Sequence, residues 1–406
     1  MNIGIITNFY PPFVRGGAEQ VAWRTAEELY RRGHRVFVVS TKRFESPTDI
    51  AYPIVDRRAE TVYRFFPFNF YHIVDAYKHA FPLRAAWTAV DLWNPMPSRV
   101  LRGILKQERP DVMITHNLKG IGMQTASEIR CQGIYHIHTL HDVQLSVPSG
   151  LLMYGREKTF LNNPISRWMY EKVTKSIFQS PQIVLSPSRF LASLYHERGF
   201  FPKSRMEILP NPTPDMQVPI RPARQAGPIR LLFAGQLEKH KGILMLLDLL
   251  EKLSVPSELH IAGEGTLAKQ ISKRAAADKR VVYHGFISFE YLLKLFDICD
   301  ATVVPSLCYE NSPTVISDSF LAGVPVIASD IGGIGELVQE GSNGLLVLPG
   351  NKEALAAAIE KMAKDLPYWA KQEAVIRKTV EPYRLSKYVD HLEQLFAGCK
   401  LDDRGR

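Results

Sequence analysis

The chain has 406 residues, of which 46% are hydrophobic and 22% are charged, as in a soluble globular protein long enough for two domains. Its four cysteines are widely spaced, which argues against disulfides and structural zinc. The net charge of +9 comes from residues 1–227, which hold 29 Lys and Arg against 18 Asp and Glu.

This uneven charge predicts an acidic partner for the first half: nucleic acid, an anionic membrane surface or a phosphorylated substrate. Charge alone does not choose among the three. The apolar run Ile3–Ile6 starts almost at the first residue, without a signal-peptide pattern, and no apolar run approaches the ~20 residues that span a bilayer. We therefore expect a cytoplasmic protein and leave open a peripheral contact with the inner face of the membrane.

Residues 1–210 are predicted to form a first domain of alternating strands and helices. Helical spacing of apolar residues predicts a helix at Ala18–Arg32. Just before it, Gly16 and Gly17 would let a phosphate or sugar approach the backbone; alternatively, they form a tight turn that needs positive φ. The pair is not a GxGxxG motif, which disfavours a nicotinamide dehydrogenase. The predicted strands are Ile3–Ile6, Arg35–Val39, Val112–Thr115, Ile134–Leu140 and Ile183–Ser186.

The stretch Tyr63–Leu105 is dense in Phe, Tyr and Trp, with scattered basic residues. A pair of helices packed on the sheet is the simpler interpretation. The alternative is a surface for an acceptor or for anionic lipid, because aromatic and basic side chains suit such an interface.

Residues 211–227 are rich in proline and lack a helical period, which indicates a linker. Residues 228–380 are predicted to form a second domain, in which apolar strands again alternate with helices. The predicted strands are Arg230–Ala234, Glu258–Ala262, Arg280–Tyr283, Ala301–Val304, Pro325–Ala328 and Leu345–Val347, and the helices are Ile243–Leu253, Leu267–Ala277, Phe289–Asp297, Val315–Leu321, Gly335–Gln339 and Lys352–Lys364. This alternation predicts an α/β protein with two Rossmann-like, doubly wound parallel sheets and a cleft between the domains.

The stretch Ser306–Gly323 is predicted to be the centre of the site. It runs from a strand end through a loop into a short helix, for which Ser312 is expected to be the N-cap and Pro313 the first residue. The free N–H groups and positive dipole of a helix start bind anions. Glu310, beside that start, could hold the hydroxyls of a group attached to phosphate.

Other loops at predicted strand ends share this chemistry. Gly235–Gly242 contains Lys239 and Lys241, which could meet a diphosphate, although a lysine pair in a solvated loop is the commoner case. Ala262–Gly265 is another glycine turn, and Gly332–Gly333 a fourth.

His141 ends a strand, where it could bond a sugar hydroxyl or transfer a proton, but a lone histidine is more often structural. His116, His136 and His138 are equally available by composition. Because Asp402–Asp403 lies in a charged tail and no clustered His and Asp set appears, we predict no metal and no cofactor.

Together these segments resemble the group 4 retaining glycosyltransferases. The resemblance covers nearly the whole chain, in order, and is most specific in the second half. Its motifs are Asn8–Pro12 with Gly16–Glu19, Pro210–Pro212, Gly235–Gly242, Ala262–Gly265, Glu310–Gly323 and Pro325–Ala328.

The resemblance implies the GT-B architecture, in which the first domain binds the acceptor and the second holds most of a nucleotide-sugar donor. It also implies transfer without metal and with retention. It also implies that a last helix within residues 381–406, at Leu385–Phe396, returns to the first domain. Glu310, Lys241 and His141 would be the catalytic positions, binding sugar hydroxyls, the diphosphate and the reacting sugar. The implied donor-binding positions are Gly16, Gly17, Gln236, Lys241, Gly263, Phe286 at the base, Glu310, Asn311, Ser312, Pro313, Thr314 and Asp318.

Two positions depart from the family pattern. Asp318 stands where the family has a glutamate that binds the ribose, and Gln236 stands where it has an arginine that binds the diphosphate. Aspartate is one methylene shorter, and a neutral hydrogen bond is roughly half as strong as a charge-assisted one.

We therefore expect a retaining, metal-independent hexosyltransferase that uses a nucleoside-diphosphate sugar, UDP-glucose type favoured over GDP-sugars. Its acceptor would be a saccharide or a lipid-linked saccharide, as in polysaccharide or glycolipid biosynthesis. The alternatives are an epimerase or phosphorylase on the same fold, or a catalytically weak protein that acts as a membrane-associated binding partner. We expect no nucleic-acid partner.

Overall fold

The computed structural model describes residues 1–13, 16–57, 60–157 and 164–399. Asp402–Asp403 and the rest of the predicted tail lie outside the described residues. The chain divides into two compact units, each made of segments that are not contiguous in sequence. The first contains residues 1–151, 164–212 and 385–399 of the described chain, and the second contains Leu152–Glu157 and Thr213–Arg384.

The first unit is built on an eight-stranded sheet in the order β3-β4-β2-β1-β5-β6-β7-β8. All neighbouring strands are parallel except the pair β3 and β4. The strands are β1 (Asn2–Ile6), β2 (Arg35–Thr41), β3 (Ile54–Arg57), β4 (Thr61–Phe65), β5 (Val112–Thr115), β6 (Tyr135–Thr139), β7 (Ile183–Ser186) and β8 (Arg205–Ile208).

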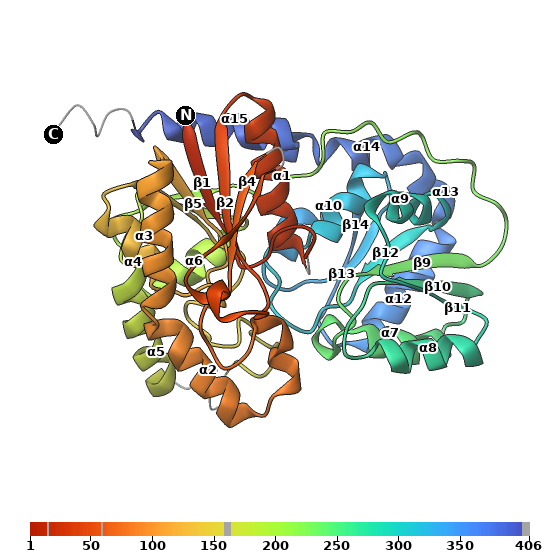
Figure 1. Cartoon of the computed structure of the whole chain (residues 1–406). Helices are drawn as coiled ribbons and strands as arrows, with labels where there is room; N and C mark the ends of the chain where they lie inside the picture. Colours follow the sequence, from red (N-terminus) through yellow and green to blue (C-terminus); the bar gives the residue numbers. More distant parts are fainter. Residues whose placement is uncertain (14–15, 58–59, 158–163, 400–406) are drawn as a thin grey trace. The chain divides into compact units, whose positions relative to one another are not determined.

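Helices surround this sheet (Figure 1). They are α1 (Gly17–Arg31), α2 (Phe81–Trp93), α3 (Met96–Glu108), α4 (Thr125–Cys131), α5 (Pro164–Phe178), α6 (Arg189–Glu197) and α15 (Leu385–Phe396), with the short 3₁₀ helices η1 (Pro47–Ile50) and η2 (Ile73–Lys78). Helix α15 comes from the end of the chain and shares a buried core with α1 and the centre of the sheet, because Leu29, Val389 and Leu392 pack in one cluster with Ile3 and Ile5. Arg32 fixes this helix further, donating to Asp390 at 2.6 Å and Glu393 at 2.8 Å.

The second unit has a six-stranded, fully parallel sheet in the order β11-β10-β9-β12-β13-β14. Its strands are β9 (Ile229–Ala234), β10 (Ser257–Ala262), β11 (Val281–Gly285), β12 (Ala301–Val304), β13 (Val326–Ser329) and β14 (Gly344–Val347). Its helices are η4 (Lys239–Lys241), α7 (Ile243–Leu250), α8 (Ala268–Ala277), α9 (Phe289–Ile298), α10 (Thr314–Leu321), α11 (Ile334–Leu337), α12 (Lys352–Lys364), α13 (Leu366–Lys371), α14 (Glu373–Lys378) and η5 (Glu381–Tyr383).

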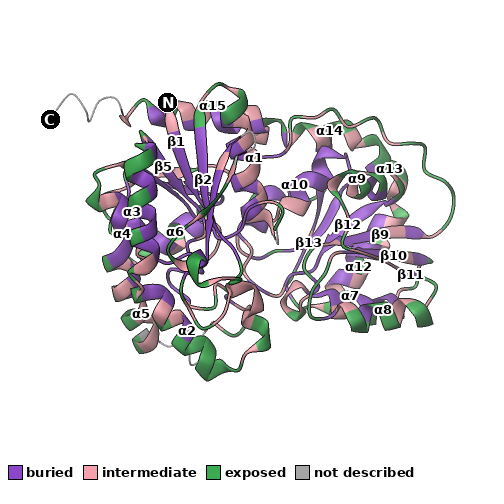
Figure 2. Cartoon of the chain, in the orientation of Figure 1, coloured by how far each residue is buried: buried purple, intermediate pink, exposed green. Residues whose placement is uncertain are grey.

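Both faces of this second sheet are covered, as the apolar strands predict. Leu231 and Phe233 pack with α7 and α12 on one face, while Leu232 and Val304 belong to clusters on the other face that include α9 and α10. Figure 2 shows the strands of each sheet buried and the outer sides of the helices exposed. Two α/β units with parallel-dominated, doubly wound sheets are therefore present.

Several local predictions were wrong or incomplete. Ser312 is not the N-cap of α10: Pro313 takes that position in an extended conformation (φ −61°, ψ 117°), so the helix begins one residue later, at Thr314. Helix α7 ends at Leu250, three residues before the predicted end. The aromatic stretch begins as strand β4 and then, as the simpler interpretation predicts, forms the helix pair α2 and α3.

Candidate functional site

The loops that follow β9 and β12 meet at the point where the strand order of the second sheet reverses. In the order β11-β10-β9-β12-β13-β14, the chain runs outward in one direction from β9 and in the other from β12. In α/β proteins, ligands bind beyond the carboxyl ends of the strands at such a reversal. Lys241 follows β9 and Glu310 follows β12, so topology brings the two predicted residues together.

Lys241 and Glu310 form the centre of this site. The Nζ of Lys241 donates to Oε1 of Glu310 at 2.5 Å, and the side chains are only 25% and 13% exposed. Ser306 Oγ donates to the same carboxylate oxygen at 2.9 Å. The site therefore places one cation and one anion, both largely withdrawn from water, where a sugar phosphate could meet them.

The electrostatics keep both groups charged. Burial favours the neutral acid, but the charge of Lys241 and the hydrogen bonds from Lys241 and Ser306 lower the pKa of Glu310. Burial also opposes the charge on Lys241, yet Glu310 raises its pKa above the usual value. Burial and the charge of Glu310 together raise the pKa of the neighbouring Cys308 thiol to about 12, so that thiol stays protonated at neutral pH.

Two glycines allow the loops to approach each other this closely. Gly242 has φ +77°, and a Cβ there would lie 1.9 Å from the carbonyl oxygen of Pro305. Gly332 has φ +62°, and a Cβ there would lie 2.2 Å from the carbonyl oxygen of Glu310, to which Gly333 N donates at 2.7 Å. The backbone of Glu310 is thus held from one side by this glycine pair.

The start of α10 adjoins Glu310 directly. Asn311 and Ser312 are buried, Pro313 is the N-cap, and Thr314 is the first helical residue. The N–H groups of this first helical turn are a suitable site for phosphate. Asp318 lies one turn further along the helix and is 5% exposed.

The remaining predicted residues of the second unit lie on neighbouring loops. Gln236 is exposed at the end of β9, and Gly263, at the end of β10, packs so closely that a Cβ would lie 1.9 Å from the carbonyl oxygen of Gly235. Phe286 follows the edge strand β11 and is 70% exposed.

In the first unit, Gly16 and Gly17 lie at the start of α1, at the end of the loop that follows β1. Gly16 is the N-cap with φ −156°, an extended conformation that any residue adopts, and its N–H donates to Oε2 of Glu19 at 2.8 Å. Gly17 is not among the residues with positive φ either. A tight turn with positive φ is therefore the wrong explanation for this glycine pair. The other explanation, close approach of a ligand to the backbone, is the one that is left.

His141 follows β6 and is hydrogen-bonded to His116, with 2.8 Å between His141 Nε2 and His116 Nδ1 and the two rings stacked. Burial lowers the pKa of His141 to about 4, so the imidazole is neutral at pH 7. His136 and His138 are buried and both bond to Thr115 Oγ1, which gives them structural roles.

One part of the second unit was not predicted. Residues Leu152–Glu157, which come from the first half of the sequence, lie along the loop that carries Glu310. Tyr309 N donates to the carbonyl of Leu152 at 2.8 Å, Tyr154 N donates to that of Leu307 at 3.0 Å, and Met153 pairs with Cys308 in an antiparallel bridge. These main-chain bonds hold the loop that carries Glu310. Because they do not depend on side-chain type, no sequence pattern indicates them. Ser306 lies in the predicted stretch Ser306–Gly323, two residues after β12 and four before Glu310, but no separate role was predicted for it.

Within the described ranges, no group of three or more His, Cys, Asp or Glu side chains is arranged to hold a metal ion. Searched over the same ranges, no helix combines the length and the apolar character that crossing a membrane requires.

Two family models match the chain, one over each half. Residues 220–379 match "Glycosyl transferases group 1", and residues 16–212 match "Glycosyl transferase 4-like domain". The chain pairs these two glycosyltransferase domains. Its predicted family resemblance is confirmed, and so is its identity as a glycosyltransferase.

This glycosyltransferase is similar in sequence to the glycogen synthase of Mycobacterium tuberculosis, with 26% identity over 385 residues that cover 90% of the chain and 86% of the relative. In structure it is similar to sucrose-phosphate synthase from Thermosynechococcus elongatus, with a TM-score of 0.78, 20% identity and coverage of 98% and 99% of the two chains. Anabaena HepE in complex with UDP-glucose gives a TM-score of 0.67 at 16% identity, covering 98% and 99%. These likenesses confirm the GT-B fold class.

Proposed function

We propose that this glycosyltransferase moves a hexose from a nucleoside-diphosphate sugar, of the UDP-glucose type, with retention of anomeric configuration. The acceptor is a saccharide or a lipid-linked saccharide, in the synthesis of a polysaccharide or glycolipid. The proposal rests on the bond between Lys241 and Glu310 beside the start of α10. The similar fold of HepE, whose complex holds UDP-glucose, supports the choice of donor.

In this proposal the donor binds beside the hydrogen-bonded pair Lys241 and Glu310. An ammonium group has three N–H donors, so Lys241 can keep Glu310 and still donate to a phosphate oxygen. The second carboxylate oxygen of Glu310 accepts from sugar hydroxyls, while the N–H groups at the start of α10 face the diphosphate. Gln236, Gly263, Asp318 and Phe286 would complete the contacts to the diphosphate, ribose and base.

The chemistry follows from where charge develops. As the glycosidic bond breaks, the departing diphosphate gains negative charge, which Lys241 and the positive end of α10 stabilise without a metal ion. The acceptor hydroxyl attacks from the same face, and the leaving phosphate takes its proton. In the first unit, the neutral imidazole of His141 can hydrogen-bond a sugar hydroxyl at pH 7.

The test measures donor binding and transfer separately. The thermal transition of the purified chain is recorded with UDP-, GDP- and ADP-hexoses, because a ligand that binds the native state raises its apparent stability. We expect the largest increase with UDP-glucose. Glu310→Ala and Lys241→Ala should lower the transfer rate at least about a hundredfold, the loss of one charge-assisted interaction. The exposed Lys273→Ala, on α8, serves as the matched control.

Each alternative has its own outcome in this experiment. Near-normal transfer in either site variant would remove Glu310 and Lys241 from the site. Turnover of the donor without an acceptor would indicate an epimerase, and turnover that needs free phosphate would indicate a phosphorylase. Donor binding with neither hydrolysis nor transfer would favour a binding protein.

A further inference from the structure

Large hydrophobic side chains are exposed together on three segments of the first unit: the loop 68–70 and the helices α2 and α5. Single exposed hydrophobic residues are ordinary, but a group of them marks an interaction surface. These side chains, each at least 55% exposed, form the exposed apolar surface: Phe68, Phe70, Phe81, Trp93, Ile165, Trp168 and Met169.

Helix α5 has an apolar stripe on each of two sides. Its inner side is buried in the unit through residues such as Ile177. On its outer side Ile165, Trp168 and Met169 follow each other at helical spacing, and Lys172 comes one turn later. The Nζ of Lys172 lies 5.2 Å from the centre of the Trp168 ring. A surface helix normally presents polar residues to water, so this outer stripe indicates a partner.

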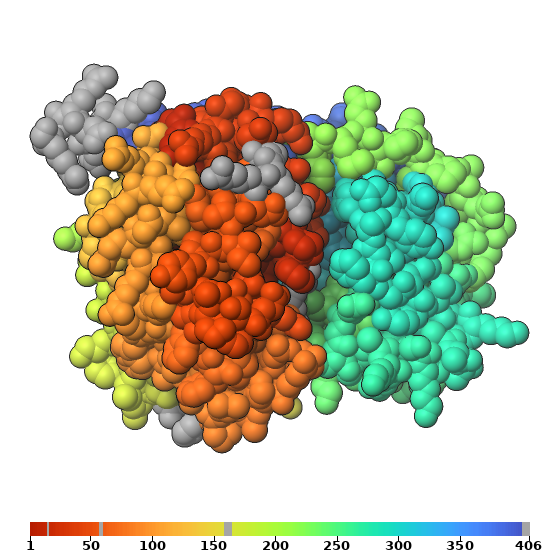
Figure 3. All heavy atoms as spheres, viewed as in Figure 1, coloured from red at the N-terminus to blue at the C-terminus, as the bar shows by residue number. Residues whose placement is uncertain are grey.

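The three segments adjoin one another. Asn94, directly after α2, donates from Nδ2 to the carbonyl of Phe68 at 2.6 Å, which holds the loop against this helix. Trp93 at the end of α2 and Lys172 of α5 line one hollow of about 500 Å³. In Figure 3 the orange segment that includes α2 forms a continuous surface of the first unit. The exposed side chains therefore belong to one surface.

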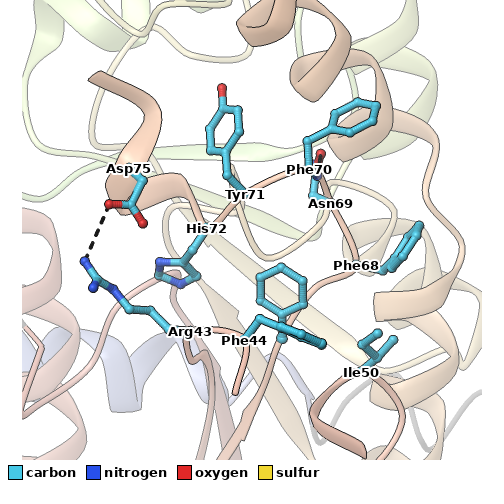
Figure 4. A pocket seen from close by; sticks show the side chains of 10 residues that line it. Arg43, Phe44, Ile50, Phe68, Asn69, Phe70, Tyr71, His72 and Asp75 are labelled. Atoms are coloured by element: carbon cyan, nitrogen blue, oxygen red, sulfur yellow. Dashed lines mark hydrogen bonds and ion pairs between the residues drawn. The ribbon is translucent and has the colours of Figure 1, made fainter. Parts of the chain in front are cut away.

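The acids of these segments leave little negative charge on the surface. Within residues 67–94 and 164–179 they are Asp75, Asp91 and Glu171, and Asp91 is buried. Asp75 accepts from Lys78 at 2.7 Å and lies 3.6 Å from Arg43. Figure 4 shows Asp75 and Arg43 facing each other, on the side of a pocket opposite to Phe68 and Phe70. Glu171 is buried beside three cations, Arg167, Lys175 and Arg198.

Exposed cations give the surface a positive charge. Arg84 of α2 and Lys172 of α5 are exposed, and Arg130 lines the same hollow as Lys172. Lysine is depleted at interfaces between proteins, whereas tryptophan is enriched where a protein meets a membrane. Anionic lipid head groups attract Lys and Arg side chains near the bilayer. Exposed indole rings beside cations therefore fit a lipid surface better than a protein partner.

We propose that the exposed apolar surface docks on an anionic phospholipid bilayer. The rings of Trp93 and Trp168 enter the boundary between head groups and acyl chains, while Arg84 and Lys172 bond to lipid phosphates. None of these residues belongs to the predicted donor site, so the docking does not depend on the proposed function.

The test measures sedimentation of the full chain with vesicles. Phosphatidylcholine vesicles with and without about 30% phosphatidylserine are compared. We expect at least about tenfold tighter binding to the anionic vesicles, which weakens as salt is added. The double variant Arg84→Gln/Lys172→Gln should weaken this binding by about fivefold for each lost charge. The double variant Trp93→Ser/Trp168→Ser should weaken it by about tenfold or more.

Two further variants separate ring insertion and surface identity from charge alone. Lipids with brominated acyl chains should quench the tryptophan fluorescence of the wild type. They should quench Trp93→Phe/Trp168→Phe much less, although this variant keeps its aromatic rings and still sediments. Lys273→Gln/Tyr368→Ser is the matched control, because both side chains are exposed but belong to the second unit. It should bind vesicles as the wild type does.

Several outcomes would overturn the proposal. They are equal binding to both kinds of vesicle, wild-type binding by Trp93→Ser/Trp168→Ser, and an equally large loss in the control. A dimer in analytical ultracentrifugation that Trp168→Ser dissociates, without vesicle binding, would overturn it in favour of a second copy of the chain. The thermal transition of every variant, and its increase with UDP-glucose, should match the wild type. Anionic-vesicle binding without any increase from UDP-glucose would refute the proposed donor and support the docking surface.

Discussion

The bond between Lys241 and Glu310 makes a quantitative prediction about the free energy of unfolding of the second unit. Lys241→Met and Glu310→Gln keep the volume of each side chain but remove its charge. Each single variant leaves the other charge largely buried, with Ser306 as the remaining hydrogen-bond donor to position 310. The double variant leaves no unpaired charge.

The magnitude follows from the burial of the pair. Removing one partner of a fully buried ion pair costs about 3–5 kcal/mol. Because these side chains remain 25% and 13% exposed, water relieves part of that cost, and we expect about 2–3 kcal/mol for each single variant. The double variant should lose about 2 kcal/mol less than the sum of the two.

Native-state hydrogen exchange of the amides in β9 and β12 measures this free energy within the second unit, apart from the unfolding of the first. The matched control is the pair of Lys352 and Asp248, 3.5 Å apart with side chains 46% and 58% exposed, where Lys352→Met should change stability by less than about 1 kcal/mol. Additivity of the two site variants within about 0.5 kcal/mol would refute the coupling.

Three other predictions concern the backbone, pH and metal. Gly242→Ala should destabilise the second unit by about 3 kcal/mol or more in urea denaturation, because it combines φ +77° with a carbonyl oxygen 1.9 Å from the new Cβ. The control Gly341→Ala, with φ +75° but open space around it, should cost only about 1–2 kcal/mol in the same assay. The pKa of His141, about 4 when folded and about 6.5 when unfolded, means that the unfolded chain binds more protons below pH 6.5, so stability falls as pH drops through this window. His141→Gln should therefore reduce the loss between pH 6.5 and 4 by about 3 kcal/mol, and an unchanged pH profile would contradict the cause assigned to that pKa. Finally, transfer should persist in excess EDTA; a loss of rate that Mg²⁺ or Mn²⁺ restores would show that the diphosphate needs a metal.

The alternation of apolar strands and helices predicted most of the second unit, because strands buried on both faces leave continuous apolar runs such as Ala301–Val304. The strands that were not predicted belong to the margins of the first sheet. Strand β8 has the half-exposed sequence Arg205–Ile208 at one edge, and β3 lies at the other edge, antiparallel to β4. Strand β4 was not predicted because the aromatic stretch Tyr63–Leu105 overlaps its end and continues past it.

The candidate site likewise has one part that could be predicted from the sequence and one part that could not. Glu310 and the lysine loop could be found because each follows a predicted strand, and the family resemblance supplied their roles. Their direct bond spans 69 residues of sequence and depends on Gly242 and Gly332, which no local pattern connects. The pairing of Met153 with Cys308 was equally invisible, since main-chain hydrogen bonds accept nearly any side chain.

The position of α15 has a consequence for the order in which the protein is made. The core of the first unit includes Leu392 and Phe396, so it is incomplete when residue 212 leaves the ribosome. At about 5–20 residues per second, the roughly 170 residues that follow take about 10–35 seconds to synthesise. During that interval the apolar face of α1 around Leu29 lacks its partner, while the second unit, of which Leu152–Glu157 has already been made, is still being synthesised. The first unit thus keeps an uncovered apolar face until α15 has been made.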